Sequence, residues 1–164
     1  MGVSGCGKST LAAGFAQTAG WSFIEGDELH PPANVEKMKA GIPLTDEDRQ
    51  PFLRAVADRL ATSSGGAVAS CSALKRVYRD QIRKSAGEVL FVHPVVPRLE
   101  LTIRLAGRQG HFMPMSLLKS QFATLEAPAP DEWSVTLDGL LPLPQQIEAV
   151  KEALWGKHET SRIA

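Results

Sequence analysis

Cysteine is scarce in this chain of 164 residues, and its two cysteines, Cys6 and Cys71, lie far apart. Two distant cysteines cannot build the disulfide framework of small secreted domains, and their spacing matches no zinc-ligand pattern. The chain also lacks a signal-peptide pattern and any apolar run of membrane-spanning length. These absences argue against disulfide-rich and membrane-spanning proteins, and they favour a cytoplasmic, reducing environment.

An excess of charge is absent as well, because 18 lysine and arginine residues balance 18 aspartate and glutamate residues. Without a bulk positive field, we expect no binding to nucleic acid or to an anionic membrane surface. Any anion-binding site must therefore be local. The length suits one domain, which we place at residues 1–156, followed by a polar, frayed tail at residues 157–164.

A phosphate-binding motif stands at the start of the chain. The stretch GVSGCGKST, residues 2–10, fits the spacing G-x-x-x-x-G-K-S/T, and an apolar helical run follows at once. Its glycines allow successive backbone N–H groups to point at a phosphate chain, where the N-terminal end of the next helix also points. Lys8 would bring a mobile charge to the terminal phosphates, and the Ser9 hydroxyl suits a magnesium ion.

The motif therefore predicts binding of ATP with Mg²⁺, and the alternative is a glycine-rich turn before a helix. The predicted nucleotide-binding residues in the loop are Gly2, Ser4, Gly5, Cys6, Gly7, Lys8, Ser9 and Thr10. The thiol of Cys6 could be oxidised there, but a residue at this free position of the loop is more often a small filler.

No apolar run stands upstream of Gly2, although a phosphate loop normally connects a buried strand to its helix. A central strand missing from a parallel sheet would leave two neighbouring strands with unpaired edges. We therefore favour a chain that was cut or that starts late over a fold without this strand, and the sequence leaves both alternatives open.

Short apolar, β-prone runs alternate with helical patterns along the rest of the chain. Strands are expected at residues 21–24, 67–71, 89–93 and 135–137. Helices are expected near residues 7–19, 34–39, 52–61, 74–84, 97–106, 115–125 and 143–154. This alternation predicts an α/β fold in which helices flank a parallel sheet. Thr45 and Asp48 resemble a capping box, and Pro51 is expected to kink a helix or to start a new one.

Ligands of open parallel sheets bind beyond the carboxyl ends of the strands, and the first candidate stretch there is EGDELHPPANVEKM, residues 25–38. In an extended chain Glu25 and Asp27 would lie on one side. Asp27 could then accept the proton of a substrate hydroxyl, while Glu25 helps to order the water around a metal ion. Alternatively, both are solvated turn or cap residues. His30 in such a loop is more often a hydrogen-bonded histidine than an acid or base.

Two further stretches carry basic residues. In TDEDRQPF, Arg49 could grip a carboxylate or a polyol with paired donors, or it could form a surface ion pair with the neighbouring acids. In CSALKRVYR, Lys75 and Arg79 have the i, i+4 spacing of one helical face. Ser72 could cap that helix, and both basic side chains could simply be solvated.

The last candidate stretch is RLAGRQGHF, in which Arg104 and Arg108 share a face at the end of a helix. Gly107 and Gly110 suit a hinge. We expect a mobile lid over residues 108–125 that would carry cationic groups over the phosphates and exclude water. The alternative is two basic residues placed favourably near a helix C-terminus.

Four segments together resemble the gluconokinases of the small P-loop sugar-acid kinase family, over residues 2–126. They are the phosphate loop, GDELHPPANVEKMKAGIPLTDEDRQPFL, CSALKRVYRD, and GRQGHF with SQFATLE. The resemblance implies transfer of the ATP γ-phosphoryl group to the 6-hydroxyl of D-gluconate, on a fold related to shikimate and adenylate kinases. Arg104, Arg108 and His111 also look like the stretch leading into the adenylate kinase lid, which implies Arg104 near the adenine and Arg108 near the transferring phosphate.

The resulting hypothesis assigns catalysis to Lys8, Asp27 and Arg108, and magnesium to Ser9 and Glu25. Nucleotide contacts outside the loop are assigned to Arg104 and Arg108. The predicted acceptor-binding residues are Asp27, His30, Arg49, Ser72, Lys75, Arg79 and His111. The alternatives are a kinase for a related small acid such as shikimate, and a catalytically silent nucleotide-binding module. The resemblance also suggests a homodimer.

Overall fold

The computed structural model describes residues 1–107 and 115–160 of the chain. Its strands are β1 (Ser22–Glu25), β2 (Ala67–Ser70), β3 (Phe91–Val95) and β4 (Ser134–Asp138). Its helices are α1 (Lys8–Ala19), α2 (Pro32–Lys39), α3 (Asp46–Thr62), α4 (Arg76–Ala86), α5 (Arg98–Ala106), α6 (Met115–Thr124) and α7 (Leu143–Thr160), with a 3-10 helix η1 (Gly26–Leu29) after β1.

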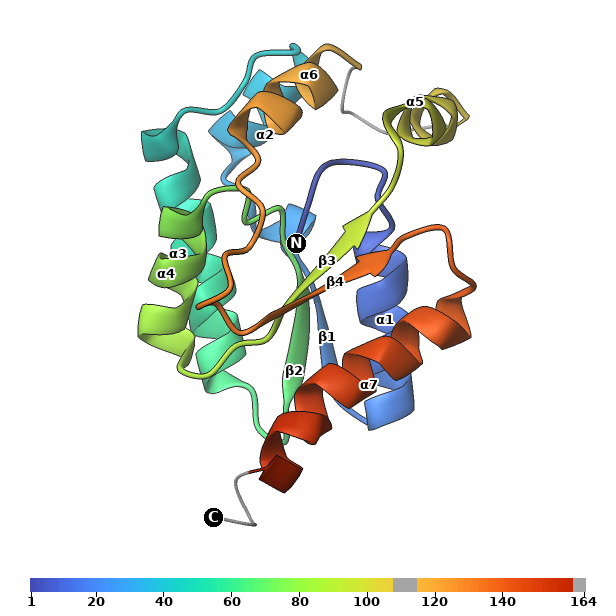
Figure 1. Cartoon of the computed structure of the whole chain (residues 1–164). Helices are drawn as coiled ribbons and strands as arrows, with labels where there is room; N and C mark the ends of the chain where they lie inside the picture. Colours follow the sequence, from blue (N-terminus) through green and yellow to red (C-terminus); the bar gives the residue numbers. More distant parts are fainter. Residues whose placement is uncertain (108–114, 161–164) are drawn as a thin grey trace.

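The predicted α/β fold is confirmed, because every expected strand and helix is present, most of them within a few residues of the expected bounds. In Figure 1 the helices α3 and α4 cover one side of the strands, and α1 and α7 cover the other. Helix α7 continues to Thr160, into the expected tail, and residues 161–164 lie outside the described part. No helix among the described residues is long and apolar enough to cross a membrane.

The strands form two parallel pairs rather than one continuous sheet in the described part of the chain. β1 pairs with β2, and β3 pairs with β4. A cavity of about 330 Å³ separates the pairs, lined by Val68 of β2 and Val92 of β3 among others. Met1 and Gly2 bridge the gap: the amino group of Met1 donates to the Val92 carbonyl, and Gly2 N donates to Ser72 O at 2.9 Å. The inner edges of β2 and β3 therefore face an apolar cavity.

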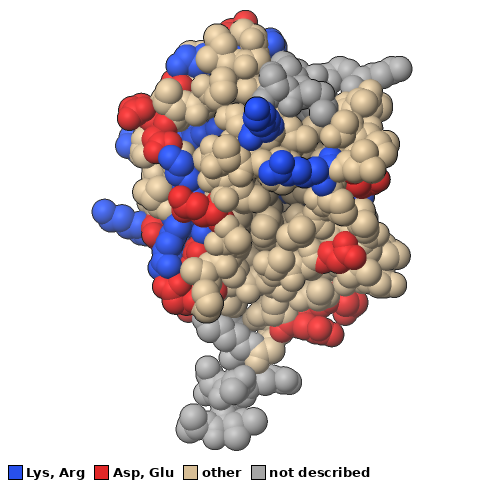
Figure 2. Space-filling view, turned by 45° about the horizontal axis from the view of Figure 1, so that its top comes forward, with Lys and Arg blue, Asp and Glu red and all other residues tan. Residues whose placement is uncertain are grey.

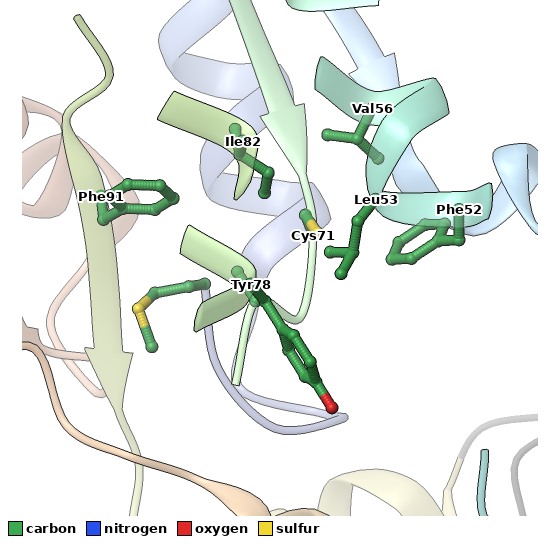
Figure 3. Close-up of a cluster of buried hydrophobic side chains, with 9 residues drawn as sticks. Phe52, Leu53, Val56, Cys71, Tyr78, Ile82 and Phe91 are labelled. Atoms are coloured by element: carbon green, nitrogen blue, oxygen red, sulfur yellow. The ribbon is translucent and has the colours of Figure 1, made fainter. Parts of the chain in front are cut away.

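A cluster of buried side chains joins α3 and α4 to the strands, as Figure 3 shows. Its labelled members are Phe52, Leu53, Val56, Cys71, Tyr78, Ile82 and Phe91. Most of them are almost completely buried, and burial of this kind stabilises a fold by about 25 cal/mol per Å² of apolar surface. The cluster thus packs α3 and α4 against the strands and against Met1, the residue before the phosphate loop.

Of the two alternatives predicted for Pro51, a kink or a new helix, the structure contradicts the new helix. Asp48 N donates to Thr45 Oγ1 at 3.2 Å, and Thr45 N donates to Asp48 Oδ2 at 2.9 Å, so the capping box is complete. Helix α3 begins at Asp46 and continues through Pro51. A proline early in a helix removes one hydrogen bond, which the cap and the buried face of α3 offset.

The segment expected as a lid is described only in its second part. Residues 108–114 lie outside the described residues, and α6 follows at Met115. Leu117 of α6 packs against Met38 of α2 and against Leu44. Helix α6 thus lies beside α2, above the phosphate loop in Figure 1.

Candidate active site

The phosphate loop has the backbone conformation that its glycines predict. Gly2, Gly5 and Gly7 have φ angles of 128°, 83° and 94°. Helix α1 begins directly after Gly7 without a side-chain cap, and its first turn holds no acidic residue. The unpaired N–H groups of that first turn are therefore left for a ligand, and a phosphate is the group that such a helix end suits. No atom lies within 4 Å of a Cβ built on Gly7, so the cradle is open.

Some side chains of the phosphate loop face the space where a ligand would bind, and others are buried in the core. The ammonium group of Lys8 donates to the backbone carbonyl of Val3 at 2.9 Å, and the side chain lines a pocket described below. Ser9 and Thr10 lie in the first turn of α1. Cys6 is 2% exposed and belongs to a buried cluster with Leu101 of α5. Its thiol therefore packs into the core, which agrees with the interpretation of Cys6 as a small filler.

The acidic stretch after β1 is held by β2. The Ser70 hydroxyl donates to Glu25 Oε1, and Gly26 N donates to Ser70 Oγ at 3.0 Å. Asp27 N lies 3.5 Å from Glu25 Oε1, so that Glu25 caps η1. We expected the two carboxylates to lie on one side of an extended segment. They do not, because the chain turns into η1 directly after Glu25. Asp27 is exposed and lines the pocket, whereas Glu25 is anchored at the strand ends.

One small pocket, of about 40 Å³, brings together residues from six separate segments. We call it the acceptor pocket, because four of the residues predicted to bind the acceptor line it. The residues that the sequence singled out and that line it are Ser4, Lys8, Asp27, His30, Arg49 and Ser72. A phosphate-loop lysine, a carboxylate and an arginine therefore face one space, which is an arrangement suited to a phosphate donor beside a hydroxylated acid.

His30 forms one wall of the acceptor pocket. Its ring stacks on Phe52, with centroids 3.8 Å apart and an interplanar angle of 9°. Burial lowers the pKa of His30 to about 4, and Arg49 acts in the same direction. The ring is therefore neutral at pH 7. Its buried Nδ1 has no hydrogen-bond partner among the described residues, contrary to the expectation of a hydrogen-bonded loop histidine.

Lys75 and Arg79 do not share a helical face. Helix α4 begins at Arg76, and Lys75 precedes it in an extended conformation, so Ser72 is not its cap either. The Lys75 ammonium binds both carboxylate oxygens of Asp46, at 2.7 and 2.8 Å. Arg79 points into the interior. Arg49 lies on the pocket side, with its guanidinium carbon 5.9 Å from the centre of the Tyr78 ring.

Arg79 is completely buried and forms a two-pronged ion pair with Glu132. Its Nε and Nη2 donate to the two carboxylate oxygens at 2.6 and 2.8 Å, and Nη1 donates to backbone carbonyls. The guanidinium beside it lowers the pKa of Glu132 to about 2. Arg79 does not line the acceptor pocket, so in this structure its contacts are those of an internal residue.

Of the three residues predicted to carry the lid chemistry, Arg104, Arg108 and His111, the structure describes Arg104. Its Nε donates to Glu100 at 2.9 Å, and Nη2 lies 3.5 Å from Gly139 O in the loop after β4. Arg108 and His111 lie outside the described residues. Figure 2, in which the top of Figure 1 is turned forward, shows lysine and arginine side chains near the middle of this face. The net charge of the whole chain is nevertheless zero.

Sequence reasoning missed the contribution of α6. Ser120 and Gln121 line the acceptor pocket, and Gln121 Oε1 accepts a hydrogen bond from Ser4 N at 2.7 Å. These residues stand in the SQFATLE stretch that contributed to the family resemblance. No local pattern assigns them a role, because their position depends on how α6 returns to the phosphate loop.

Known proteins are similar to this chain in sequence and in fold. A family model described as an AAA domain matches residues 1–128. A gluconokinase of Gluconobacter oxydans is 54% identical over 142 residues, which cover 85% of this chain and 80% of that protein.

Solved structures extend the likeness to the fold. The crystal structure of a gluconokinase from Sinorhizobium meliloti has a TM-score of 0.88 and 46% identity, covering 99% of this chain and 93% of that one. An APS kinase from Mycobacterium tuberculosis, with a TM-score of 0.65 and 20% identity over 94% of both chains, shares the fold alone. The phosphate loop, the sequence relatives and the fold lead to one conclusion: the chain belongs to the gluconokinase family of P-loop kinases.

Proposed function

We propose that this protein transfers the γ-phosphoryl group of ATP to the 6-hydroxyl group of D-gluconate. The observation that carries the proposal is the acceptor pocket, where Lys8 of the phosphate loop, Asp27 and Arg49 face one space. The curated relatives named as gluconokinases support the same substrate.

Asp27 is proposed to hold the acceptor hydroxyl and to accept its proton as the bond to phosphorus forms. Lys8 would move from the Val3 carbonyl to the terminal phosphates, where its charge offsets the charge of the transferring group. Arg49 would bind the carboxylate of the sugar acid, because a half-buried guanidinium offers paired donors. Arg104 and Arg108 stay proposed contacts of the nucleotide, and Lys75 and His111 stay proposed contacts of the acceptor.

Magnesium fits the donor set of the loop, since Ser9 offers a hard oxygen in the first turn of α1, beside the open cradle at Gly7. Ser9 and Glu25 are the residues proposed to hold the ion, directly or through ordered water. When bound, it would neutralise charge on the nucleotide oxygens.

A cytoplasmic location is proposed as well, because both cysteines are buried free thiols and the proposed reaction uses ATP. A homodimer without nucleic-acid partners is the assembly that we propose. Sedimentation of the purified protein tests the oligomeric state.

A coupled ADP-release assay over a panel of acceptors tests the function. With MgATP, we expect kcat/KM for D-gluconate to exceed that for D-glucose by about a hundredfold or more, because a neutral sugar leaves the cationic group unpaired. Arg49→Gln should shrink this ratio, while Arg54→Gln, on the exposed side of α3, should not.

Three outcomes would contradict the proposal. Equal efficiency for D-gluconate and D-glucose would remove the carboxylate contact. Faster turnover of shikimate would favour the related kinase, and ATP binding without any turnover across the panel would indicate a silent nucleotide-binding module.

A further inference from the structure

The buried pair of Arg79 and Glu132 has no part in the proposed chemistry, yet it is the most completely enclosed charged group described. Both side chains have a relative exposure of 0%. A buried ion pair is weak evidence for net stability, because the attraction between the charges must first offset the loss of hydration. A pair with so many hydrogen bonds to the backbone is better explained by the positions in which it holds the surrounding segments.

The hydrogen bonds of Arg79 join segments that are distant in sequence. Its Nη1 donates to the carbonyls of Ala73 at 3.2 Å, Leu74 at 3.3 Å and Glu126 at 3.1 Å. Its other prong holds Glu132, whose Oε1 also accepts from Ala129 N at 2.8 Å. One guanidinium thus fixes the turn after β2 against the segment that runs from α6 to β4.

The turn held in this way is strained and reaches the acceptor pocket. Ala73 has a φ of 39°, a left-handed conformation that residues with a side chain rarely adopt. The residue before it, Ser72, lines the acceptor pocket, and its carbonyl accepts from Gly2 N of the phosphate loop at 2.9 Å. The position of Ser72 therefore depends on contacts on both sides of the turn.

The other segment leads back to helix α6, which also contributes to the lining of the pocket. Glu126 N donates to Leu74 O at 2.8 Å, directly after the end of α6, and Leu125 N donates to Gln121 O at 2.9 Å. Gln121 lines the acceptor pocket and binds Ser4 N. Arg79 is consequently connected to the segments that carry Ser72 and Gln121, two lining residues of the pocket, without lining the pocket itself.

We propose that Arg79 and Glu132 are positioning residues for the acceptor: together they set the distance between the Ser72 turn and helix α6, and so the shape of the acceptor pocket. The inference rests on the proposed function for the identity of the acceptor. It differs from the sequence-based expectation, in which Arg79 binds the sugar acid directly.

The test compares Arg79→Lys, Glu132→Gln and the double variant by steady-state kinetics, with KM and kcat measured separately for D-gluconate and for ATP. We expect each single variant to raise the KM for D-gluconate roughly tenfold, with the KM for ATP changed less than about threefold. The double variant should be no worse than the more affected single variant, because both changes break one unit. Arg83→Lys is the matched control, since Arg83 lies on the same helix in a partly exposed pair with Asp80.

Other roles give different patterns. If Arg79 contacts the acceptor directly, Arg79→Lys raises the KM for D-gluconate and Glu132→Gln does not. If the pair only stabilises the fold, thermal unfolding shifts while both KM values stay at the wild-type level. Either pattern would overturn the proposal.

Ala73→Gly keeps the test open if the variants of the pair do not fold. Glycine relaxes the left-handed turn and leaves the ion pair intact, so the melting temperature should stay close to wild type while the KM for D-gluconate rises. An unchanged KM in that variant contradicts the proposal. Wild-type turnover of D-gluconate is measured first, because its absence would refute the proposed function instead; the same kinetics would then use the acid that the panel identifies.

Discussion

The backbone of Gly26 lies so close to Ser70 that a Cβ built on Gly26 would stand 1.9 Å from the Ser70 carbonyl oxygen. Gly26 N donates to Ser70 Oγ, and the same hydroxyl donates to Glu25. The ends of β1 and β2 are thereby joined at the point where η1 begins. Asp27, the next residue, is directed to the acceptor pocket by this contact.

Gly26→Ala should therefore lower stability and turnover more than a glycine-to-alanine substitution at an exposed position. Because a backbone atom blocks the added methyl group, we expect the free energy of unfolding to fall by about 1–3 kcal/mol, and turnover to fall with it as η1 shifts. Urea denaturation and ADP release measure the two effects. Gly156→Ala is the control, since no atom lies within 4 Å of a Cβ there. Wild-type turnover in Gly26→Ala would contradict the role of this contact.

Asp27→Asn tests the proposed base. Asparagine is nearly isosteric but a poor proton acceptor, so turnover should fall by roughly a hundredfold or more while ATP still binds. If the transition state is very loose, the loss would reflect positioning of the hydroxyl instead. Calorimetry measures nucleotide affinity, and Glu28→Gln, at an exposed neighbouring position, is the control. Full activity in Asp27→Asn would remove this residue from the mechanism.

Lys8→Ala should abolish most kinase activity and leave the fold intact. The change removes one positive charge at the phosphates, and the hydrogen bond lost in the free protein is the one to the Val3 carbonyl. Circular dichroism and ADP release are the measurements, with Lys39→Ala, in an exposed pair with Glu36, as control. Near-normal turnover would refute the phosphate-loop assignment.

Stability should fall as the pH drops from 6.5 towards 4. Burial lowers the pKa of His30 and of His93 to about 4, so between these pH values the unfolded chain binds more protons than the native one. Each histidine adds a slope of at most about 1.4 kcal/mol per pH unit, with stability rising with pH. The buried amino group of Met1, whose pKa falls to about 6, acts in the same direction between pH 6 and 8.

Denaturant unfolding between pH 5 and 6 measures this slope. His30→Gln and His93→Gln should each reduce it, because glutamine does not titrate. If the slope of stability against pH is the same in the wild type and in both variants, burial does not lower the pKa of either histidine in the native state.

An apolar strand of about five or six residues added before Gly2 should raise the melting temperature, since it could pair with the inner edges of β2 and β3. The cavity between Val68 and Val92 would take its side chains. A segment of equal length made of glycine and serine is the control. Equal melting temperatures for the two extensions would count against pairing at this place.

Much of this molecule follows from local pattern. The spacing from Gly2 to Ser9 predicts a phosphate loop because the conformation depends on a few consecutive residues, and the loop glycines have the expected φ angles. The alternation of apolar runs and helical periods predicts the α/β fold for the same reason. Asp27 is predicted as a site residue from its place just beyond the end of a strand, which the chain order alone indicates.

The partners of the charged side chains were decided by tertiary structure. The i, i+4 spacing placed Lys75 and Arg79 on one face, but Lys75 precedes α4 and binds Asp46, while Arg79 is buried against Glu132. Gln121 reaches the phosphate loop only because α6 returns to it. By itself, the sequence determined the loop, the order of elements and the family, since these depend on short-range spacing. The pairing of these polar and charged side chains depends on packing between segments some 30 to 120 residues apart, which no local sequence pattern can predict.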